Sequence, residues 1–236
     1  MYEVEDRHWW FSAKRRIIRD LLRRFCVRRG DAPLRIADVG CGCGRNLEEL
    51  PEGFVGIGID ASPVAIDFCR KRGVDACLAM LPNDVPLEPG SFDAVIMADV
   101  LEHIDDDSGA AAAAVRLLAP GGVLIATVPA LPSLWTSWDE IHGHKRRYTK
   151  ATLEKALACD GMTRALLSYY NTFLFPPAVA ARIMRRVMGD RGATELKVPH
   201  AWVNAALERI FASERHLLGR VPLPIGLSLV AVMRKA

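Results

Sequence analysis

The cysteines of this 236-residue chain form no recognisable metal-binding or disulfide pattern. All six are scattered, and no two of them stand in a C-x-x-C pair. This spacing argues against a zinc ribbon and against a disulfide-stapled secreted domain, and it favours a reducing compartment. A chain of this length buries roughly 70–75% of its unfolded surface, so it needs no such staple to fold.

Long hydrophobic runs are also missing. The longest apolar tract, residues 221–233, contains two prolines and is shorter than the ~18–20 residues that a membrane-spanning helix requires. The opening residues, MYEVEDRHWWF, include acids and no apolar run, so we expect no secretory signal peptide. These absences predict a cytoplasmic protein without a transmembrane segment.

The excess of positive charge is small. A formal net charge of +3 is too mild to indicate a nucleic-acid partner. The charge is uneven, because residues 1–35 hold ten Lys or Arg and only five acidic residues. Apolar residues recur there at helical spacing, which predicts a basic helical lid over residues 1–33. Its basic face is either solvated while the helix covers a sheet, or it meets an anionic substrate or a membrane surface.

From residue 34 onward, strand-like and helix-like segments alternate. This order predicts right-handed crossovers and a parallel sheet covered on both faces, which is a doubly wound α/β fold. We expect strands at residues 34–39, 54–59, 76–80, 92–98 and 123–128, and helices at 46–50, 63–72, after Val100, and at 108–119 with Ser108 as its cap.

The alternation ends after residue 129. Residues 135–148 are polar and aromatic without a clear period, so we expect a loop there. The rest of the domain, which spans residues 34–236, is predicted as a helix at 149–159, a strand at 163–175, a helical insertion at 176–223 with helices at 178–188 and 202–218, and a last strand at 228–234.

A glycine-rich turn follows the first predicted strand. Gly40, Gly42 and Gly44 stand at alternate positions between a strand and a helix, where glycine lets the backbone turn sharply and approach a ligand. The dinucleotide pattern G-x-G-x-x-G is not met, because Arg45 occupies the place of its third glycine. The turn therefore disfavours a pyrophosphate and suits a cofactor without phosphates.

Asp60 ends the second predicted strand. A carboxylate at this point can accept hydrogen bonds from both hydroxyls of a ribose. Alternatively it caps the next helix, a role that Ser62 before Pro63 can also fill. Together, the glycine turn and this acid predict a nucleoside ligand.

Five motifs appear in order along the first half of the chain. They are D-V-G-C-G-C-G at 38–44, G-I-D at 58–60, S-F-D-A-V-I-M at 91–97, L-E-H-I at 101–104 and L-L-A-P-G-G at 117–122. The set resembles the class I S-adenosylmethionine-dependent methyltransferases, of the small-molecule type represented by the type 11/12 and ubiquinone-pathway O-methyltransferase groups. The resemblance implies a seven-stranded, mostly parallel sheet with an antiparallel last strand, and S-adenosylmethionine as the cofactor.

The same resemblance assigns the cofactor site position by position. The methionine and ribose parts would lie on the glycine turn, and the adenine would lie beside residues 79–81. The family often carries an acid after the third strand, where this chain has Leu78-Ala79-Met80-Leu81, so apolar and backbone contacts to the adenine are expected. The implied cofactor-binding residues are Asp38, Gly40, Gly42, Gly44, Asp60, Ala61, Met80, Leu81, Met97 and Ala98.

The acceptor side is expected among histidines and aromatic residues. A hydroxyl acceptor must lose its proton, and histidine is the side chain best suited to take it near neutral pH. We predict His144 as the base, with His103 and Tyr148 as further catalytic residues. The substrate-binding candidates are Trp9, Trp10, Trp135, His142, Arg146 and Arg147.

Part of this assignment comes from a second resemblance. A subset of small-molecule methyltransferases carries H-W-W-F near the start and D-E-x-x-G-H-x-R-R-Y after the fifth strand, and both motifs stand in this chain. The tryptophans of the first motif could instead pack a helix against the sheet. Arg146 and Arg147 could instead pair with Asp139 and Glu140.

Asp99, Glu102 and His103 stand at i, i+3 and i+4, which would place them on one helical face able to bind a metal. Ubiquinone-pathway O-methyltransferases look similar here, with Glu-x-x-Glu-His, and this implies a divalent ion. A hydrogen-bonded structural cluster accounts for the same three residues, so we predict no metal site.

The sequence leaves four classes of function open. We expect a methyltransferase that acts on a hydroxyl, ahead of an amine, of a small molecule that is apolar, sugar-linked or lipid-linked. The insertion would form a cap over that acceptor, or else a core or dimer contact. A methyltransferase acting on RNA or protein and a non-catalytic nucleoside-binding partner subunit are the alternatives, and a nicotinamide oxidoreductase is a weaker one. Both a monomer and a homodimer stay open.

Overall fold

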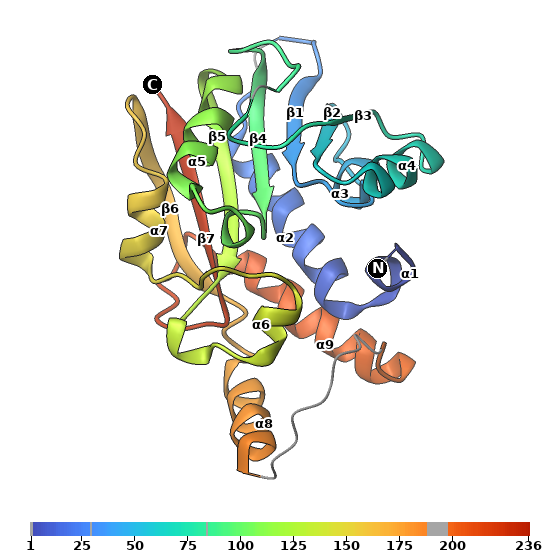
Figure 1. Cartoon of the computed structure of the whole chain (residues 1–236), viewed down its shortest axis with the longest axis vertical. Coiled ribbons are helices and arrows are strands. Elements are labelled where there is room, and N and C mark those ends of the chain that lie inside the picture. The colour runs from blue at the N-terminus through green and yellow to red at the C-terminus, as the bar shows by residue number, and fades with distance from the viewer. Residues whose placement is uncertain (1, 29, 84, 188–197) are drawn as a thin grey trace.

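The computed structural model describes residues 2–28, 30–83, 85–187 and 198–236. Within them one seven-stranded sheet has the order β3-β2-β1-β4-β5-β7-β6 (Figure 1). β7 lies antiparallel to β5 and β6, and the other pairs are parallel. The predicted fold class is therefore confirmed. The strands are β1 (Leu34–Val39), β2 (Phe54–Asp60), β3 (Ala76–Leu78), β4 (Phe92–Ala98), β5 (Leu118–Pro129), β6 (Met162–Tyr170) and β7 (Ser228–Lys235).

Helices cover both faces of this sheet. Along the central strands, Ala37 and Val95 pack into a core with α5 and α7, whereas Ile36 and Ile96 pack into a second core with α2. This alternation follows from the two-residue period of a strand. The helices are α1 (Tyr2–Arg7), α2 (Trp9–Phe25), α3 (Arg45–Glu48), α4 (Pro63–Lys71), α5 (Asp107–Leu117), α6 (Ser137–Ile141), α7 (Lys150–Ala156), α8 (Phe175–Val187) and α9 (Ala201–Ser213), with single 3₁₀ turns η1 (Leu101–His103), η2 (Pro132–Leu134) and η3 (Glu214–His216).

Two local predictions before residue 110 are wrong. The helix expected after Val100 is only the 3₁₀ turn η1. The helix α5 begins at Asp107 and not after Ser108, because Asp106 Oδ1 accepts a hydrogen bond from the Gly109 N–H at 2.8 Å and caps the helix. Asp106 is one of the residue types that cap helices best, so a cap two residues earlier was available from the sequence.

Two further predictions fail after residue 129. The expected loop at 135–148 contains α6, which starts with a capping box in which Thr136 and Asp139 bond each other's backbone. The strand expected to reach residue 175 ends at Tyr170, because Asn171 adopts a left-handed backbone conformation with φ of 56°.

The N-terminal helix α2 belongs to the core of the domain. Ile17, Ile18 and Leu21 pack against the sheet. The expected basic outer face is only partly solvated, since Lys14 and Arg15 are buried. Lys14 pairs with Asp99, and Arg15 donates to the Glu5 carbonyl at 2.9 Å, so two of the positive charges are used inside the molecule.

Residues between β6 and β7 form a cap from α8 and α9. α9 docks on the start of α2, where the Trp9 N–H donates to Asn204 Oδ1 at 2.9 Å and Ser12 Oγ donates to Glu208 Oε1 at 2.8 Å. The predicted helical stretch 178–188 extends to Met188, which lies outside the described residues. In the part of the chain that the structure describes, no helix is both long enough and apolar enough to cross a membrane.

Candidate active site

The glycine turn lies at the carboxyl end of β1, in the centre of the sheet. Gly40, Gly42 and Gly44 all have positive φ angles, between 55° and 80°, which explains why glycine occupies each position. A side chain at Gly40 would clash with Val100. A Cβ placed on Gly42 would meet no atom within 4 Å, so the backbone here faces open space.

Asp60 lies beside this turn at the end of β2. Its Oδ2 accepts a hydrogen bond from the Gly42 N–H at 2.9 Å, and its Oδ1 accepts one from the Ser62 N–H at 2.9 Å. The carboxylate therefore fixes the turn in the orientation that leaves Gly42 open. Ser62, and not Asp60, caps α4 through the Ala65 N–H. The predicted contact of Asp60 with a ribose stays a prediction.

The remaining predicted cofactor residues divide into exposed and buried ones. Ala61 and Met80 are exposed near the ends of β2 and β3, where an adenine could reach them. Leu81 and Met97 are buried in the core, so they offer little side-chain surface to a ligand. Ala98 is half-buried at the end of β4.

Asp38 is fully buried beneath the glycine turn. Its Oδ2 accepts a hydrogen bond from Asn46 Nδ2 at 3.2 Å. Burial raises the pKa of Asp38 to about 7, although the hydrogen bond from Asn46 acts in the opposite direction. Asp38 therefore supports the turn from below, and its charge depends on pH near neutrality.

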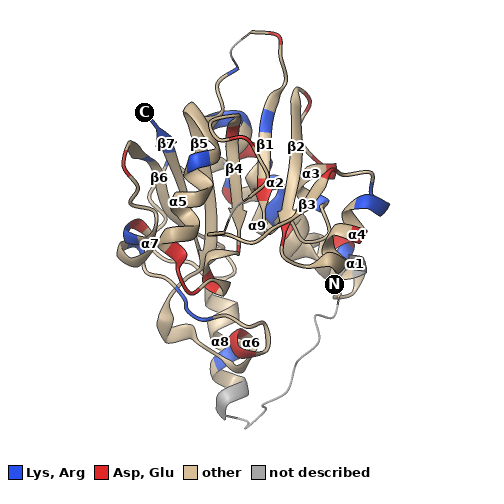
Figure 2. Ribbon diagram, turned by 45° about the horizontal axis from the view of Figure 1, so that its top comes forward, with Lys and Arg blue, Asp and Glu red and all other residues tan. Residues whose placement is uncertain are grey.

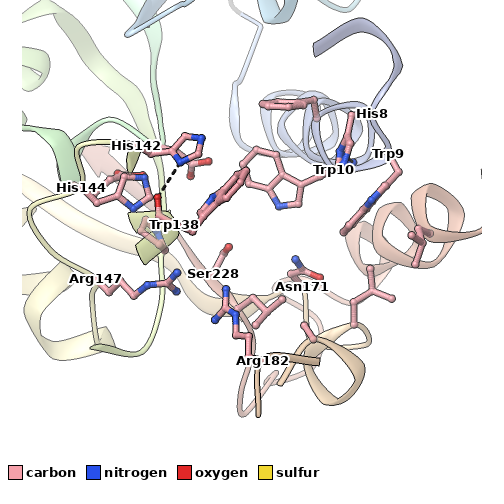
Figure 3. Close-up of a pocket in the computed structure, with 18 of the residues that line it drawn as sticks. His8, Trp9, Trp10, Trp138, His142, His144, Arg147, Asn171, Arg182 and Ser228 are labelled. Atoms are coloured by element: carbon pink, nitrogen blue, oxygen red, sulfur yellow. Dashed lines mark hydrogen bonds between the residues drawn. The ribbon is translucent and has the colours of Figure 1, made fainter. Parts of the chain in front are cut away.

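A cavity of about 660 Å³ adjoins the ends of β4 and β5 (Figure 3). The start of α2 forms one side of it, and the loop around α6 forms the opposite side. α8 and α9 contribute further walls, so the cavity is assembled from segments far apart in the sequence. The lining is mainly aromatic and apolar and consists of His8, Trp9, Trp10, Phe11, Asp99, Glu102, His103, Pro129, Trp138, His142, His144, Arg147, Asn171, Leu174, Pro177, Ala178, Arg182, Leu207, Leu227 and Ser228.

His144 is held in the cavity wall by a buried carboxylate. Its Nδ1 lies 2.9 Å from Asp139 Oδ1, and Asp139 also accepts hydrogen bonds from Arg147 Nε at 2.8 Å and Nη2 at 3.0 Å. Burial raises the pKa of Asp139, but the bonds from His144 and Arg147 outweigh burial and hold that pKa well below its usual range. A charged Asp139 favours a proton on Nδ1 of His144, which leaves Nε2 as a proton acceptor.

His103 lies against His144, with the ring centroids 4.9 Å apart and the rings nearly perpendicular. Burial and the nearby His144 lower the pKa of His103, so its neutral form is favoured. Glu102 is fully buried next to them, and neither of its carboxylate oxygens accepts a hydrogen bond from another described residue. Burial, with the neighbouring Asp99, raises the pKa of Glu102 well above its usual value.

The predicted helical face of Asp99, Glu102 and His103 is not formed, because η1 is a single 3₁₀ turn. Asp99 is bound by Lys14 and accepts a hydrogen bond from Thr127 Oγ1 at 3.0 Å. Among the described residues, potential metal-ligand atoms instead gather from Glu102, His103 and His144, within 4.8 Å of one another. The first two come from η1 and the third from the loop after α6.

The two tryptophans at the start of α2 do both things that the sequence allowed: they line a pocket, and they pack the helix against the sheet. Trp9 and Trp10 both line the cavity and both pack against the core. Trp9 contacts Phe211 of α9 edge to face, with ring centroids 6.0 Å apart. The Lys14 ammonium lies 4.8 Å from the centre of the Trp10 ring, so this aromatic pair also connects to the Lys14–Asp99 ion pair.

Three predicted site residues lie away from the cavity. Tyr148 is buried, and its hydroxyl donates to Asp107 Oδ2 at 2.8 Å, so the geometry gives no support to its predicted catalytic role. Arg146 pairs with Asp107 at 2.9 Å and does not line the cavity. Trp135 is exposed at the surface, where its Nε1 donates to Glu140 at 3.2 Å.

His142 and Arg147 do line the cavity. His142 stacks on Trp138 and its Nδ1 lies 2.9 Å from the Trp138 carbonyl (Figure 3). Arg147 forms an ion pair with Asp139, which matches the alternative that Arg147 pairs with an acid inside the molecule. Asp139 itself was absent from the predicted site, although its spacing of five residues before His144 in a Trp-rich loop was visible in the sequence.

Comparisons with known proteins bear on the family and the fold of this chain. A family described as a methyltransferase domain matches residues 37–126. The ubiquinone biosynthesis O-methyltransferase of Thiobacillus denitrificans is 32% identical over 164 residues, which cover 65% of each chain. A 37.1 kDa protein encoded by transposon Tn4556 of Streptomyces fradiae is 31% identical over 199 residues, 76% of this chain and 55% of that protein. The chain spans less than two thirds of the length of these relatives.

Solved structures show the same fold. One of them is a protein solved in complex with the Haloferax volcanii Trm112 methyltransferase activator. It matches this chain with a TM-score of 0.62 at 20% identity, and the match covers 99% of this chain and 92% of that protein. The sheet order, the glycine turn and the acid after β2 define a class I methyltransferase fold. Residues 37–126 match a methyltransferase domain, and the relatives and solved structures support S-adenosylmethionine as its cofactor.

The residues of the turn fit this donor. Gly42 leaves room for a ligand directly on the backbone, and the Asp60 carboxylate lies beside it. The turn offers no phosphate-binding glycine at Arg45, in keeping with a cofactor that carries no phosphate. The aromatic cavity begins at Asp99, just beyond the end of β4, so a donor on the turn would have its reactive end next to the cavity.

Proposed function

We propose that this protein transfers a methyl group to a hydroxyl of a small molecule bound in the aromatic cavity, with His144 as the base. The observation that carries the proposal is the His144–Asp139–Arg147 arrangement in the cavity wall. Relatives named as O-methyltransferases support a hydroxyl ahead of an amine. A cytoplasmic location stays part of this proposal, because the scattered cysteines favour a reducing compartment.

S-adenosylmethionine supplies, when bound, an electrophilic methyl group on a sulfonium. Gly42 and Asp60 would hold this donor, and its sulfur would take the electron pair of the broken carbon–sulfur bond as the methyl group passed to the acceptor oxygen. His144 Nε2 takes the hydroxyl proton, and Asp139 stabilises the imidazolium that forms. Trp9, Trp10 and Trp138 orient the acceptor and exclude water, which is the main requirement of an in-line displacement.

The proposal is tested with the full-length protein, methyl-labelled S-adenosylmethionine and matched panels of phenols, polyols and amines. We expect label in hydroxyl acceptors, and His144→Ala should lower turnover by about 10²- to 10⁴-fold. Calorimetry should show unchanged affinity of this variant for S-adenosylhomocysteine. His216→Ala, at an exposed histidine of η3, is the matched control. Full activity of His144→Ala, or transfer to amines alone, would overturn the proposal.

RNA or protein acceptors are the alternative that this assay also addresses. In the view of Figure 2, Lys and Arg and also Asp and Glu occur on the strands and on the helices around them, whereas a nucleic-acid surface is typically a continuous basic patch. The Haloferax volcanii neighbour was solved with the Trm112 activator, so a partner-dependent methyltransferase is a known use of this fold. Label appearing in added RNA or peptide, and in no small molecule, would favour that alternative.

A further inference from the structure

Asn171 carries a buried side-chain amide whose oxygen has no hydrogen-bond donor. The residue directly follows the end of β6 and is only 2% exposed. Among the residues that the structure describes, none donates a hydrogen bond to its Oδ1. Buried polar atoms of folded proteins almost always have a partner, so an orphaned acceptor indicates a group that the protein alone does not supply.

The backbone conformation of Asn171 explains the residue type but not the position of the amide. Its φ angle of 56° is left-handed, a conformation that Asn and Gly adopt most readily. The backbone here is already held by other bonds, since the Leu227 N–H donates to the Asn171 carbonyl at 3.3 Å and the Thr172 N–H donates to Glu214 Oε1 at 2.7 Å. Glycine would meet the same backbone requirement without burying a polar group.

The amide belongs to the wall of the acceptor cavity. Asn171 lines this cavity, and in Figure 3 it lies on the side away from His144. Ser228 also lines the cavity, and it pairs across the sheet with Tyr170, the residue before Asn171. The end of β6 and the start of β7 therefore bring polar side chains to a second part of the wall, apart from the histidines.

The sheet fixes the distance between the two polar parts of the cavity. Asp99 follows β4 and Asn171 follows β6, and both strands end at the same edge of the sheet with β5 and β7 between them. Three strand intervals of ~4.8 Å separate these two ends by ~14 Å. Trp9, Trp10 and Trp138 line the same cavity. A ligand that reaches both ends is therefore elongated, with an apolar middle part.

We propose that Asn171 determines which acceptors bind, because its Oδ1 accepts a hydrogen bond from a second hydroxyl at the far end of the acceptor. The acceptor class is an elongated molecule with a hydroxyl at each end and an apolar or aromatic body between them. The inference rests on the function proposed above, since the methylated hydroxyl defines the near end. An analogue without the second hydroxyl would leave Oδ1 unpaired, and a site built for a hydroxyl discriminates strongly against such an analogue.

The test compares two series of phenols by calorimetry, with the full-length protein saturated with S-adenosylhomocysteine. One series carries para-alkyl chains from ethyl to hexyl, and the other carries the same chains with a terminal hydroxyl. At the chain length that spans the cavity, the terminal hydroxyl should strengthen binding by at least about threefold. Asn171→Gly accepts the same φ angle and removes the amide, so this preference should disappear. Asn171→Ala, which removes the same amide, is the second variant.

Leu174→Ala is the matched control for the size of the cavity. It shortens an apolar side chain of the cavity wall and removes no polar group, so it should weaken both series alike and leave the hydroxyl preference unchanged. Loss of the preference in this control as well would overturn the role of Asn171, because the effect would then follow from cavity shape.

Three other results would overturn the inference. They are an equal preference in the wild type and in the Asn171 variants, no preference in the wild type at any chain length, and failure of every hydroxyalkylphenol to bind. The first would show that Asn171 serves the backbone alone. Because binding is measured without turnover, the preference should persist in His144→Ala. Full methyl transfer by His144→Ala would therefore reject the proposed base, whereas the comparison of the two phenol series would still decide the role of Asn171.

Discussion

The cofactor turn and the acceptor cavity are built in two different ways. The turn closes over a short stretch of chain, since Asp60 bonds to Gly42 only 18 residues earlier. The cavity needs contacts such as that of Trp9 with Asn204, which are 195 residues apart. The turn is therefore encoded in local motifs, whereas the cavity exists only after α2, α6, α8 and α9 have packed together.

The largest expected effect concerns the cofactor turn. Asp60→Ala removes a charged acceptor of two backbone N–H groups and of the predicted ribose hydroxyls, so affinity for S-adenosylhomocysteine should fall by at least about 10²-fold. Calorimetry measures this directly. Asp67→Ala, at an exposed acid of α4 paired with Arg70, is the control. Unchanged affinity of Asp60→Ala would remove the turn as the cofactor site.

The next effect concerns a contact inside the cavity wall. Asp139→Asn keeps the shape but removes the charge that orients His144, so turnover should fall by about 10²-fold while cofactor affinity stays the same. Because Asp139 acts through His144, adding Asp139→Asn to His144→Ala should cause little further loss. Additive losses in the double variant would show that Asp139 serves another purpose. Glu140→Gln, at the neighbouring acid bonded to Trp135, is the matched control.

The geometry of the turn follows from the sequence for a physical reason. Alternating glycines force positive φ angles wherever they occur, and an acid at the end of the second strand of a parallel sheet lies next to the turn in any such fold. His103, Trp9 and Trp10 were predicted site residues from the resemblance to methyltransferase motifs, and His144 also from its position after the fifth strand. The sequence could not show which distant residue each of these side chains would bind.

Tyr148, Arg146 and Asp139 illustrate this limit. Tyr148 and Arg146 both bind Asp107, about 40 residues earlier, and nothing local to either residue indicates that partner. Asp139 gains its importance only because Arg147 and His144 fold back onto it around α6. Such pairings depend on the packing of distant segments and not on the spacing within a motif.

A third effect tests how α2 is attached to the site. Lys14→Met leaves Asp99 without its buried partner and should destabilise the fold by about 3 kcal/mol. Urea unfolding measures this loss. Arg164→Met breaks an exposed pair with Glu154 and should cost no more than about 1 kcal/mol. Equal effects of the two substitutions would contradict the view that α2 is part of the domain core.

The last effect is a dependence of stability on pH. Burial raises the pKa of Asp38 in the folded state to about 7, so the folded protein holds this proton more tightly than the unfolded chain does. Its contribution to stability is therefore complete below about pH 4 and declines as the pH rises toward 7. Asp38→Asn should remove about 2–4 kcal/mol of that decline, measured by urea unfolding at several pH values. Identical pH profiles for both proteins would contradict this assignment.

The most direct test of the account is a crystal structure with S-adenosylhomocysteine. We expect the ribose hydroxyls within hydrogen-bond distance of Asp60, the ligand backbone along Gly42, and the thioether sulfur open toward the cavity that His103 and His144 line. A ligand bound away from the turn, or one with its sulfur directed away from these histidines, would show that the two halves of the site do not work together.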